Sequence, residues 1–508
     1  MDNPSRLVET HISTLVFVDD VVYKRKKPIR TDFVDFSTAR ARAAACRTEV
    51  ELNRRLAPDV YLGVATVTLD RLDDSDPEVA DHAVVMRRLP EDRRLAALLD
   101  DVDVGDEIDR LARLIAEFHA SARRGPDIDD ACRAPAVGAL WTDSVTEVAH
   151  VSADIIDPDE NRLVGQLAGA YVAGRTALFD GRVAAGRAVD GHGDLQADDV
   201  FCLSDGPRVL DCIEFSDRFR FGDALADVAF LAMDLERLGH PALATSFLDR
   251  YRELAGDSWP GSLAHLWIAY RAHIRAKVTC IKSGQLAASG DAAGAASAAT
   301  DARSLHALAL THLLDGRVRL VVVGGGPGTG KSTVARGLAE RLGALLVSSD
   351  QIRDEVLPRT GERRSDDPGT GRYAPELVDA VYDELLARAE AALRNGESVV
   401  ADASWLEPRR RERARAVARR TSSDLVELRC ECPAALAEER IQARAAVGSD
   451  PSEATVEVAR SMTSTVAPWP EATVLDTARP ADDVIQMAVL RSTDTPISAA
   501  MGGCRHSD

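Results

Sequence analysis

The first 90 residues alternate between apolar and polar positions, which is the period of β-strands. Residues 14–22, TLVFVDDVV, predict two short strands joined by a hairpin turn at the two aspartates. Residues 23–28, YKRKKP, continue the second strand into a basic patch. Residues 65–69 and 83–86 are also typical of strands. The pattern therefore predicts a small β-rich lobe at the start of the chain.

Helical periodicity replaces this alternation further on. One helix is already predicted within the β-rich lobe, over residues 39–56, where it ends before Pro58. Residues 107–120 place apolar side chains along one helical stripe. Further helices are expected around residues 159–180, 224–238 and 262–282. A larger, mainly helical lobe should follow the β-rich one.

From about residue 316, short apolar runs alternate with helical segments. The expected strands are residues 320–323, 344–347, 398–401 and 424–429, and the expected helices include residues 334–342 and 377–393. Alternating strands and helices favour a parallel sheet. The predicted fold class is therefore two-domain α/β, with a bilobal α+β domain at the N-terminus and a parallel-sheet α/β domain at the C-terminus.

Composition marks the boundary between the two predicted domains. Residues 283–303 are rich in Ala, Ser and Gly without apolar periodicity, which is typical of a linker or a loosely packed helix start. The predicted division is 1–285 for the first domain, 286–315 for a linker and connecting helix, 316–493 for the second domain and 494–508 for a disordered tail.

Charge and composition exclude several classes of protein. The chain has 508 residues, 45% of them hydrophobic and 28% charged, as in soluble globular proteins. Its net charge of −20 argues against a protein whose main task is to grip nucleic acid. The eight cysteines are scattered, and no apolar signal core or run of 18 apolar residues is present. A cytoplasmic protein with reduced thiols and no membrane partner is expected.

A phosphate-binding loop follows the strand at residues 320–323. The motif G-x-x-x-x-G-K-[ST] is matched by Gly325, Gly326, Pro327, Gly328, Thr329, Gly330, Lys331 and Ser332, with Thr333 next in the chain. Glycines let backbone N–H groups curl around phosphate oxygens. Lys331 supplies a cation for the β- and γ-phosphates of ATP, and Ser332 a hydroxyl for Mg²⁺. A strand precedes this loop and a helix follows it, so a nucleoside triphosphate site is predicted.

Other polar groups follow the later strands of this domain. Asp350, after the second strand, is a candidate to take the proton of an acceptor hydroxyl, and Arg353 to hold acceptor or transferred phosphate. Asp402 ends the third strand, a position expected near Mg²⁺. Arg440 and Arg444 lie four residues apart on one helix, which suits either a lid over the phosphates or a solvated face.

A second stretch rich in acidic residues lies in the first domain, over residues 190–214. A loop that contains Asp194 and ends at Asp199 precedes an apolar hairpin, and Asp211 and Glu214 follow that hairpin. Phosphoryl transfer needs one carboxylate to accept the proton of a hydroxyl and others to hold Mg²⁺. Taken alone, the stretch is equally compatible with polar surface loops in an acidic protein.

The order of basic strand, helix with a central Glu, acidic loop and hairpin resembles the aminoglycoside phosphotransferase-like branch of the protein-kinase fold. HGDLQADD, residues 192–199, is similar to that family's HGDLHxxN loop, which parallels H-R-D-x-x-x-x-N of protein kinases. The resemblance covers about residues 8–285. It implies Asp194 as the catalytic base and His192 as the loop anchor.

The same resemblance assigns an ATP-binding pair. Lys24 or Lys26 would be the strand lysine that reaches the ATP phosphates, with Glu49 as its partner on the helix. Residues 14–22 contain no glycine, so a Gly-rich phosphate loop is missing between the strands predicted there. A kinase-like domain that has lost activity is therefore an alternative.

Metal ligands follow from the same resemblance, with one choice left open. Asp199 stands where the family has a metal-binding Asn. The family's IDW segment matches IEF and implies Glu214, whereas the hairpin geometry implies Asp211, which is slightly preferred.

Residues 316–480 resemble the small P-loop kinases, a group that spans gluconate-type kinases, polynucleotide 5′-kinases and zeta-type toxins. The matching segments are the phosphate loop, SSDQIR at 348–353, VVADASW at 399–405 and ERIQAR at 439–444. The resemblance implies Asp350 as acceptor base, Arg353 as acceptor clamp, and Arg440 and Arg444 as lid arginines. No second region of homology or sensor arginine of AAA+ motors is evident, so a kinase is predicted although such domains carry an ATPase label.

The predicted function is an ATP- and Mg²⁺-dependent phosphotransferase that moves the γ-phosphoryl group to a hydroxyl of a small molecule. A sugar, amino sugar or aminoglycoside is expected at the first domain, because five acids near one cleft suit a cationic acceptor. These acids are Asp194, Asp198, Asp199, Asp211 and Glu214. The second domain is predicted to be another small-molecule kinase.

Two alternatives belong to other classes. In the first, the kinase-like domain is a degenerate sensor in a regulatory protein that binds or hydrolyses ATP. In the second, the P-loop domain is a toxin kinase of the zeta type. The oligomeric state and the coupling between the domains do not follow from the sequence.

Overall fold

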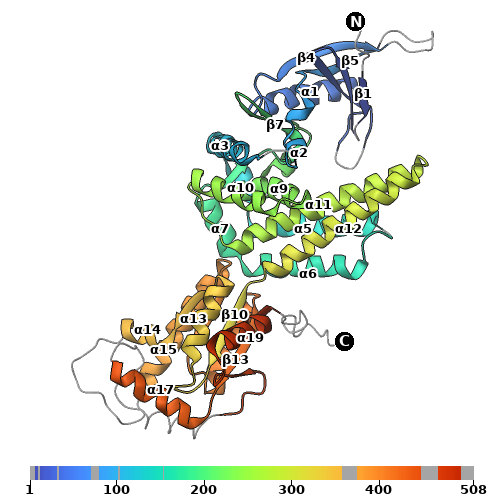
Figure 1. Cartoon of the computed structure of the whole chain (residues 1–508). Helices are drawn as coiled ribbons and strands as arrows, with labels where there is room; N and C mark the ends of the chain where they lie inside the picture. Colours follow the sequence, from blue (N-terminus) through green and yellow to red (C-terminus); the bar gives the residue numbers. More distant parts are fainter. Residues whose placement is uncertain are drawn as a thin grey trace. The chain divides into compact units, whose positions relative to one another are not determined.

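The chain forms two compact units in a computed structural model (Figure 1). The structure describes residues 6–9, 12–30, 34–69, 79–100, 103–152, 154–356, 374–447 and 467–493. The first unit comprises residues 1–164, 179–259 and 264–312, and the second comprises 165–178, 260–263 and 313–508. The predicted tail, 494–508, lies outside the described residues.

A five-stranded antiparallel sheet begins the first unit (Figure 1, blue). Its strands are β1 (Arg6–Glu9), β2 (Ser13–Val18), β3 (Val21–Lys26), β4 (Tyr61–Leu69) and β5 (Val79–Arg87). They pair in the order β1-β2-β3-β5-β4. Helix α1 (Ala39–Asn53) packs against β4 and β5. The predicted hairpin is present as β2 and β3, and the predicted helix as α1.

The sheet has one strand that the apolar pattern did not predict. Strand β1 is only four residues long, too short for its alternation to stand out from the flanking polar residues. The hairpin without glycine consequently lies between the second and third strands. The segment between β1 and β2, residues 10–12, also contains no glycine.

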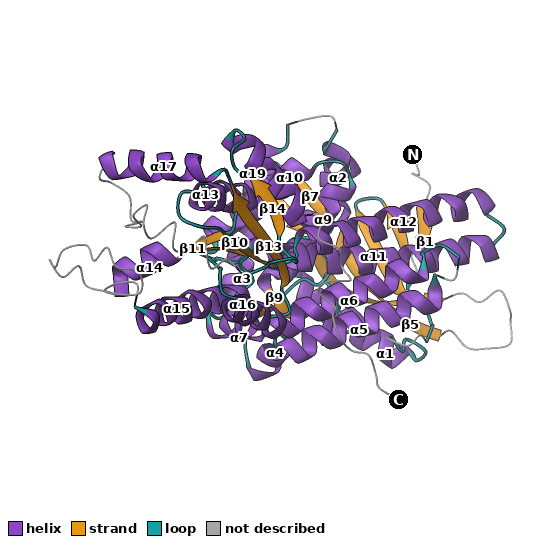
Figure 2. Ribbon diagram, turned by 90° about the horizontal axis from the view of Figure 1, so that it is seen from below, coloured by secondary structure: helices purple, strands orange, loops and turns teal. Residues whose placement is uncertain are grey.

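Helices make up most of the chain between residues 95 and 315 (Figure 2, purple). They are α2 (Leu95–Leu98), α3 (Gly105–Ser121), α4 (Pro126–Ala131), α5 (Ala134–Val151), α6 (Pro158–Gly174), α7 (Thr176–Ala184), α8 (Asp217–Arg220), α9 (Ala224–Arg237), α10 (Pro241–Leu254), α11 (Gly261–Ala288) and α12 (Ala292–Asp315). Two short antiparallel pairs interrupt them, β6 (Ala188–Asp190) with β9 (Phe221–Asp223) and β7 (Val200–Leu203) with β8 (Gly206–Val209). The predicted α+β bilobal fold is confirmed.

The segment expected to be a linker and connecting helix is mostly helical. Residues 286–315 form the end of α11 and the whole of α12, separated by a short turn at Ser289–Asp291. Alanine has the highest helix propensity of all residues, so an Ala-rich stretch without a strong apolar stripe still forms a helix when it finds a packing partner. Buried Ala298, Ala302 and Leu305 supply that contact.

The second unit is built on a five-stranded parallel sheet. Its strands are β10 (Arg319–Gly324), β11 (Leu345–Ser348), β12 (Val399–Asp402), β13 (Asp424–Glu431) and β14 (Thr473–Asp476). They lie in the order β11-β12-β10-β13-β14. The helices are α13 (Lys331–Leu342), α14 (Ser349–Val356), α15 (Pro375–Arg394), α16 (Pro408–Arg420), α17 (Ala434–Val447) and α19 (Ala481–Thr493). The predicted parallel-sheet α/β class is confirmed.

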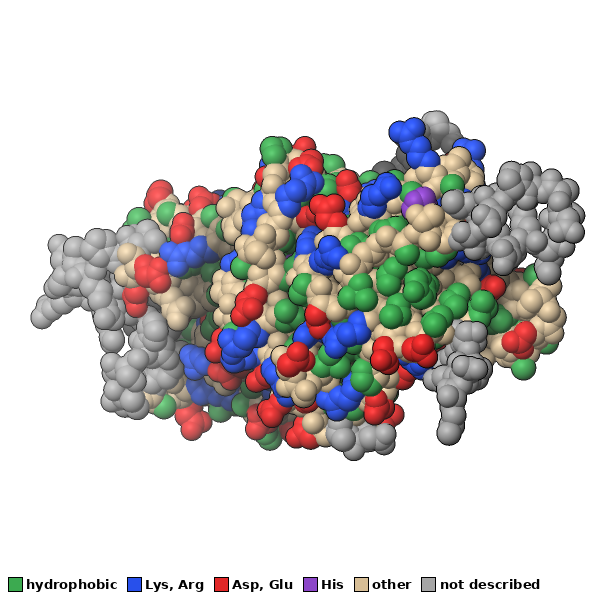
Figure 3. Space-filling model, turned by 90° about the horizontal axis from the view of Figure 1, so that it is seen from above, with side chains coloured by type: hydrophobic (Ala, Val, Ile, Leu, Met, Phe, Trp, Pro, Cys, Tyr) green, Lys and Arg blue, Asp and Glu red, His purple; other side chains and the backbone are tan. Residues whose placement is uncertain are grey.

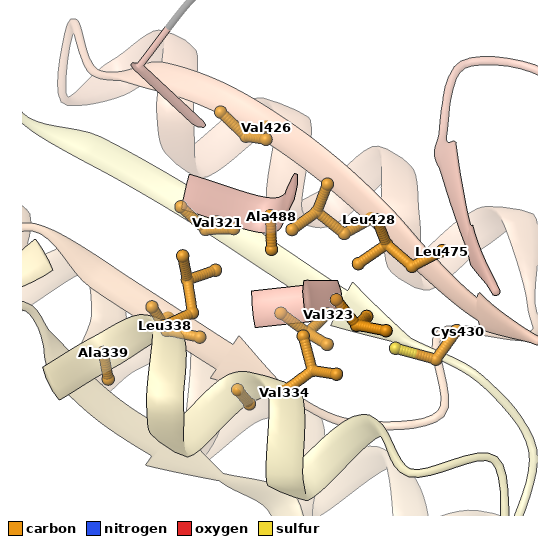
Figure 4. Close-up of a cluster of buried hydrophobic side chains, with 13 residues drawn as sticks. Val321, Val323, Val334, Leu338, Ala339, Val426, Leu428, Cys430, Leu475 and Ala488 are labelled. Atoms are coloured by element: carbon orange, nitrogen blue, oxygen red, sulfur yellow. The ribbon is translucent and has the colours of Figure 1, made fainter. Parts of the chain in front are cut away.

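The hydrophobic core of this sheet fixes the strand that leads to the phosphate loop. Val321 and Val323 of β10 pack with Val334 and Leu338 of α13, and Leu428 of β13 adjoins them (Figure 4). All five side chains are buried. Because the apolar side chains hold β10 and α13 together, the loop between them has fixed ends. Among the described helices, none is both long and apolar enough to cross a lipid bilayer.

Two neutral histidines lie inside the helical part of the first unit. His273 hydrogen-bonds Ser144 Oγ at 2.7 Å and Asn161 Oδ1 at 3.0 Å. The rings of His273 and His306 are 5.6 Å apart, and neither ring nitrogen of His306 has a hydrogen-bond partner in the described part of the chain. Burial lowers the pKa of His273 to about 3, and it lowers that of His306 against the opposing charge of Asp157.

We predict that this pair destabilises the fold in acid. A histidine whose pKa is lower in the folded state than in the unfolded state contributes stability above pH 6.5, and this contribution is lost as the pH falls below that value. The free energy of unfolding should fall by about 1.4 kcal/mol per pH unit for each histidine that stays neutral. Denaturant unfolding followed by circular dichroism between pH 7 and 5 measures this slope.

His306→Phe should make the slope shallower, and the same change at exposed His150 should leave it as in the wild-type protein. Equal slopes in the wild-type and His306→Phe proteins would contradict the prediction.

Candidate active sites

A buried network of charges joins the sheet of the first unit to its helical part. Lys24 and Lys26 are two residues apart on β3, so both side chains lie on the same face of the sheet. Glu49 of α1 forms an ion pair with each lysine, with Oε1 2.9 Å from Lys24 Nζ and Oε2 2.6 Å from Lys26 Nζ. Lys24 also pairs with Asp211, and Lys26 with Glu214. The Glu49 side chain is completely buried.

Each charge in this network is stabilised by its partners. Burial acts to lower the pKa of Lys24, but the carboxylates of Asp211 and Glu49 outweigh it and raise that pKa well above its ordinary value. Burial acts to raise the pKa of Glu49, and the two ammonium groups lower it instead. The pKa of Asp211 is likewise lowered, because Lys24 outweighs the effect of burial. These groups therefore remain ionised at neutral pH.

The structure distinguishes the two lysines and the two acids. Lys26 and Glu214 are buried against each other, with exposed side-chain fractions of 0% and 3%. Asp211, in contrast, is about half exposed and contacts Lys24. Burial raises the pKa of Glu214, and Glu49 adds to the effect. Lys24 and Asp211 are therefore the better candidates for phosphate and metal, and Lys26 and Glu214 form the more deeply buried pair.

One carboxylate holds the backbone of the predicted catalytic loop. Asp227 of α9 accepts the backbone N–H groups of His192 and Gly193, each at 2.7 Å. His119 Nε2 lies 3.1 Å from the same carboxylate. The His192 ring is buried and hydrogen-bonds the carbonyl of Leu210 at 3.0 Å, which fits the predicted role of loop anchor. The other ring nitrogen of His119, Nδ1, is hydrogen-bonded to the hydroxyl of Tyr251 at 2.8 Å.

Glycine is required at two positions next to the carboxylate of Asp227. Gly193 has φ of +88°, and a Cβ there would lie 2.9 Å from the carbonyl oxygen of Phe219. A side chain at Gly191 would lie 2.7 Å from a carboxylate oxygen of Asp227. The HGD segment therefore follows a path that only glycine at these two positions permits.

Two arginines that hold this loop were not assigned to it from the sequence. Arg55 donates to the carbonyls of Asp190 and Gly191, both at 3.0 Å. Arg271 of α11 donates to the carbonyl of Gly193 at 3.1 Å. Both arginines bind backbone carbonyls, and such contacts leave no motif in the sequence.

Three carboxylates influence one another beside the loop. Burial raises the pKa of Asp194 to about 6, with Arg275 opposing and the charge of Asp211 adding to it. Burial and the charges of Asp211 and Asp194 raise the pKa of Asp199 well above its ordinary value. Such mutual repulsion fits a divalent cation between Asp199 and Asp211. In the described part of the chain no three His, Cys, Asp or Glu side chains meet as a complete metal site, so phosphate oxygens would have to supply further ligands.

The phosphate loop of the second unit has the shape of an anion cradle. Gly325, Gly328 and Gly330 have φ of +147°, +77° and +81°, so the chain turns through conformations that favour glycine. Thr329 Oγ1 donates to the carbonyl of Gly326 at 2.8 Å, and Thr477 Oγ1 to the carbonyl of Thr329 at 2.6 Å. Helix α13 begins at Lys331, so its N-terminus faces the loop.

A cavity of about 620 Å³ opens at this loop. Predicted site residues that line it are Gly328, Gly330, Lys331, Ser332, Thr333, Asp350, Asp402 and Arg440. The strand register places Ser348 of β11 beside Asp402 of β12, at the carboxyl ends of both strands. This is the edge at which open parallel sheets bind ligands.

Asp402 fits a magnesium site. Its side chain is buried, and Oδ1 has no hydrogen-bond partner in the described residues. Burial raises its pKa, while the charge of Lys331 and a hydrogen bond from Ser332 lower it. A buried carboxylate oxygen without a partner, next to the serine of the phosphate loop, matches the donors that Mg²⁺ prefers.

The remaining predicted groups of this unit occupy different places. Arg353 lies 2.5 Å from Asp350, so the proposed clamp and base form an ion pair. Arg440 donates to the carbonyl of Thr477 at 2.9 Å, which places it at the cavity. Arg444 lies in α17, and its side chain is outside the described part of the structure.

Comparison with known proteins gives a family. Residues 320–469 match a family model described as an AAA domain. The chain is 40% identical over 487 residues to the uncharacterized protein Rv2004c of Mycobacterium tuberculosis (strain ATCC 25618 / H37Rv) and to the uncharacterized protein Mb2027c of Mycobacterium bovis, with 94% of each chain covered. The chain belongs to the family of these mycobacterial proteins.

Solved structures of two kinds each match part of the chain. A putative aminoglycoside phosphotransferase from Ralstonia eutropha JMP134 is 13% identical and covers 62% of this chain and 93% of its own, with a TM-score of 0.38. A sugar kinase from Janibacter sp. HTCC2649 is 21% identical and covers 36% of this chain and 98% of its own, with a TM-score of 0.27. The two strand orders and the AAA-domain match confirm the predicted fusion of a protein-kinase-like domain and a P-loop domain.

We predict that the two lysines of β3 differ in effect. Lys26→Met leaves Glu49 and Glu214 buried with one cation fewer, so it should reduce the free energy of unfolding by about 3–5 kcal/mol. Lys24→Met should reduce it less, because its partner Asp211 is half exposed and can be solvated. Thermal unfolding compares both variants with Lys27→Met, which alters only a surface region. A Lys24→Met protein that is less stable than Lys26→Met would reverse the assignment.

A second prediction concerns the phosphate loop. A Cβ at Gly328 would lie 2.4 Å from the backbone carbonyl oxygen of Ala437, so Gly328→Ala should abolish ATP binding at this loop. Gly326→Ala is the matched control, because its Cβ would lie 3.9 Å from the nearest atom and its φ is not positive. Titration calorimetry with a non-hydrolysable ATP analogue counts the sites. Unchanged stoichiometry in Gly328→Ala would show the prediction to be wrong.

Proposed function

We propose that the protein is an ATP- and Mg²⁺-dependent phosphotransferase that moves the γ-phosphoryl group to a hydroxyl of a small molecule. The supporting observation is the position of Asp194 in the first unit. Its carboxylate forms no ion pair or hydrogen bond with the described residues, and the charge of Asp211, which is paired with Lys24, acts on it. A free carboxylate beside a lysine–glutamate–aspartate network suits the transfer of a proton from an acceptor to which a phosphoryl group is being moved.

The chemistry at this site follows from the charges. Asp194, with a pKa of about 6, accepts the proton of the acceptor hydroxyl near neutral pH. The hydroxyl oxygen forms a bond to the γ-phosphorus of ATP. At the same time the bond between that phosphorus and the β–γ bridging oxygen breaks, and ADP leaves with this oxygen. Lys24 contacts the phosphates, and Glu49 fixes its direction. Mg²⁺, when bound by Asp199 and Asp211, neutralises charge on the phosphates.

We assign a second transfer site to the P-loop unit. Lys331 and the backbone of the phosphate loop would hold the ATP phosphates, and Ser332 and Asp402 would hold Mg²⁺. Asp350 would accept the proton of a second acceptor, with Arg353 at its side and Arg440 near the phosphates. A small acceptor is favoured over nucleic acid, because the chain has a net charge of −20. Acidic and basic side chains are interspersed on the face shown in Figure 3.

One observation favours a regulatory role as the second candidate. No glycine lies between β1 and β2, where protein kinases carry a glycine-rich loop over the phosphates. A kinase-like unit with a weaker hold on ATP would then sense a ligand, and the P-loop unit alone would turn over ATP.

ATP turnover with product detection separates these functions. A panel of sugars, amino sugars and aminoglycosides is tested with the wild-type protein, Asp194→Ala and Lys331→Ala. An acceptor-dependent rate should be lost by at least a factor of 100 in Asp194→Ala and persist in Lys331→Ala for acceptors of the first unit. Loss only in Lys331→Ala would assign the reaction to the P-loop unit. No stimulation by any acceptor in the wild-type protein would favour the regulatory role.

A further inference from the structure

Helix α11 places an arginine beside the predicted catalytic base. Arg271 donates to the carbonyl of Gly193 at 3.1 Å and to that of Ala226 at 2.9 Å, so this part of α11 lies against the HGD loop. Arg275 follows one helical turn later, on the same face of the helix. Asp194 is the next residue after Gly193, so this face of α11 also lies near Asp194. Of the charges that act on Asp194, that of Arg275 is the strongest.

The other cations in this region already have partners. Lys277 pairs with Glu147, and Arg218 with Asp143. Arg271 binds the two carbonyls and lies over the ring of Phe230 at 4.9 Å. The guanidinium of Arg275 forms no ion pair or hydrogen bond within the described residues, and it is only partly exposed. A partly buried guanidinium without a partner loses hydration that a bound anion would restore.

Two of the acids counted near Asp194 in the sequence are held by lysines. Five acids supported the expectation of a cationic acceptor. Glu214 pairs with Lys26, and Asp211 pairs with Lys24. The charges of α11 that act on Asp194 are those of Arg271 and Arg275, and both are positive.

We infer that the acceptor of the kinase-like site carries an oxyanion group, such as a phosphate or a carboxylate, and that Arg275 binds it. This inference rests on the proposed function of the same site. The planar guanidinium donates two parallel hydrogen bonds to such a group, and these orient the acceptor hydroxyl toward Asp194. The ATP phosphates are assigned to Lys24 of the β-sheet, whereas Arg275 comes from the helical part, so the two anions have separate binding groups.

Binding of matched compounds tests the inference in the full chain with a saturating non-hydrolysable ATP analogue and Mg²⁺. The pairs are glucose with glucuronate, glucose with glucose 6-phosphate, inositol with inositol phosphate, and glycerol with glycerate. At least one anionic member should bind ten times more tightly than its neutral partner. Arg275→Gln should remove that preference, and Lys277→Gln, on the same helix, should retain it.

The outcomes are distinct from a failure of the proposed function. A preference that is lost in Arg275→Gln, with the affinity for the ATP analogue unchanged, supports the inference. No preference for any anionic member, or a preference that survives Arg275→Gln, overturns it. Tighter binding of glucosamine than of glucose and glucuronate also overturns it. If the anionic compounds bind through Arg275 but give no phosphorylated product, the proposed function fails and the binding site stands.

Discussion

The first unit depends on the burial of Glu49 between two lysines. An ionised carboxylate cut off from water needs partners for its charge, and Lys24 and Lys26 lie against the two oxygens of Glu49. The consequence is geometric. Helix α1, strand β3 and the segment after β8 cannot move independently, because Asp211 and Glu214 bind the same two lysines. The relative position of the sheet and the predicted catalytic loop is thus set by charge.

The loop itself depends on a second carboxylate used in a different way. Asp227 binds two backbone N–H groups and faces a histidine ring, so its charge is spread over several donors. Its pKa is lowered, although burial alone would raise it, because His119 donates to it and the neighbouring donors add to the effect. A loop held through its backbone leaves its own side chains free. This explains how Asp194 can remain without a partner in a crowded region.

Local patterns in the sequence predicted the elements and the motifs well. The alternation at residues 14–28 placed Lys24 and Lys26 on one face of a strand, and the glycine spacing placed the phosphate loop before α13. The sequence left the choice between Lys24 and Lys26 open and preferred Asp211 to Glu214 only slightly, because both choices depend on burial across elements that are far apart in the chain. The anchoring roles of Arg55 and Arg271 were missed for the same reason. The roles of the candidate residues in catalysis remain predictions.

The contact between the phosphate loop and helix α17 bears on how this family can change. The atom opposite Gly328 is a backbone carbonyl oxygen, that of Ala437, and not a side chain. Every residue type has the same backbone oxygen, so a substitution at position 437 would not make room for a larger residue at position 328. We expect lineages of this family to vary freely at 437 while position 328 stays glycine for as long as nucleotide binding is under selection.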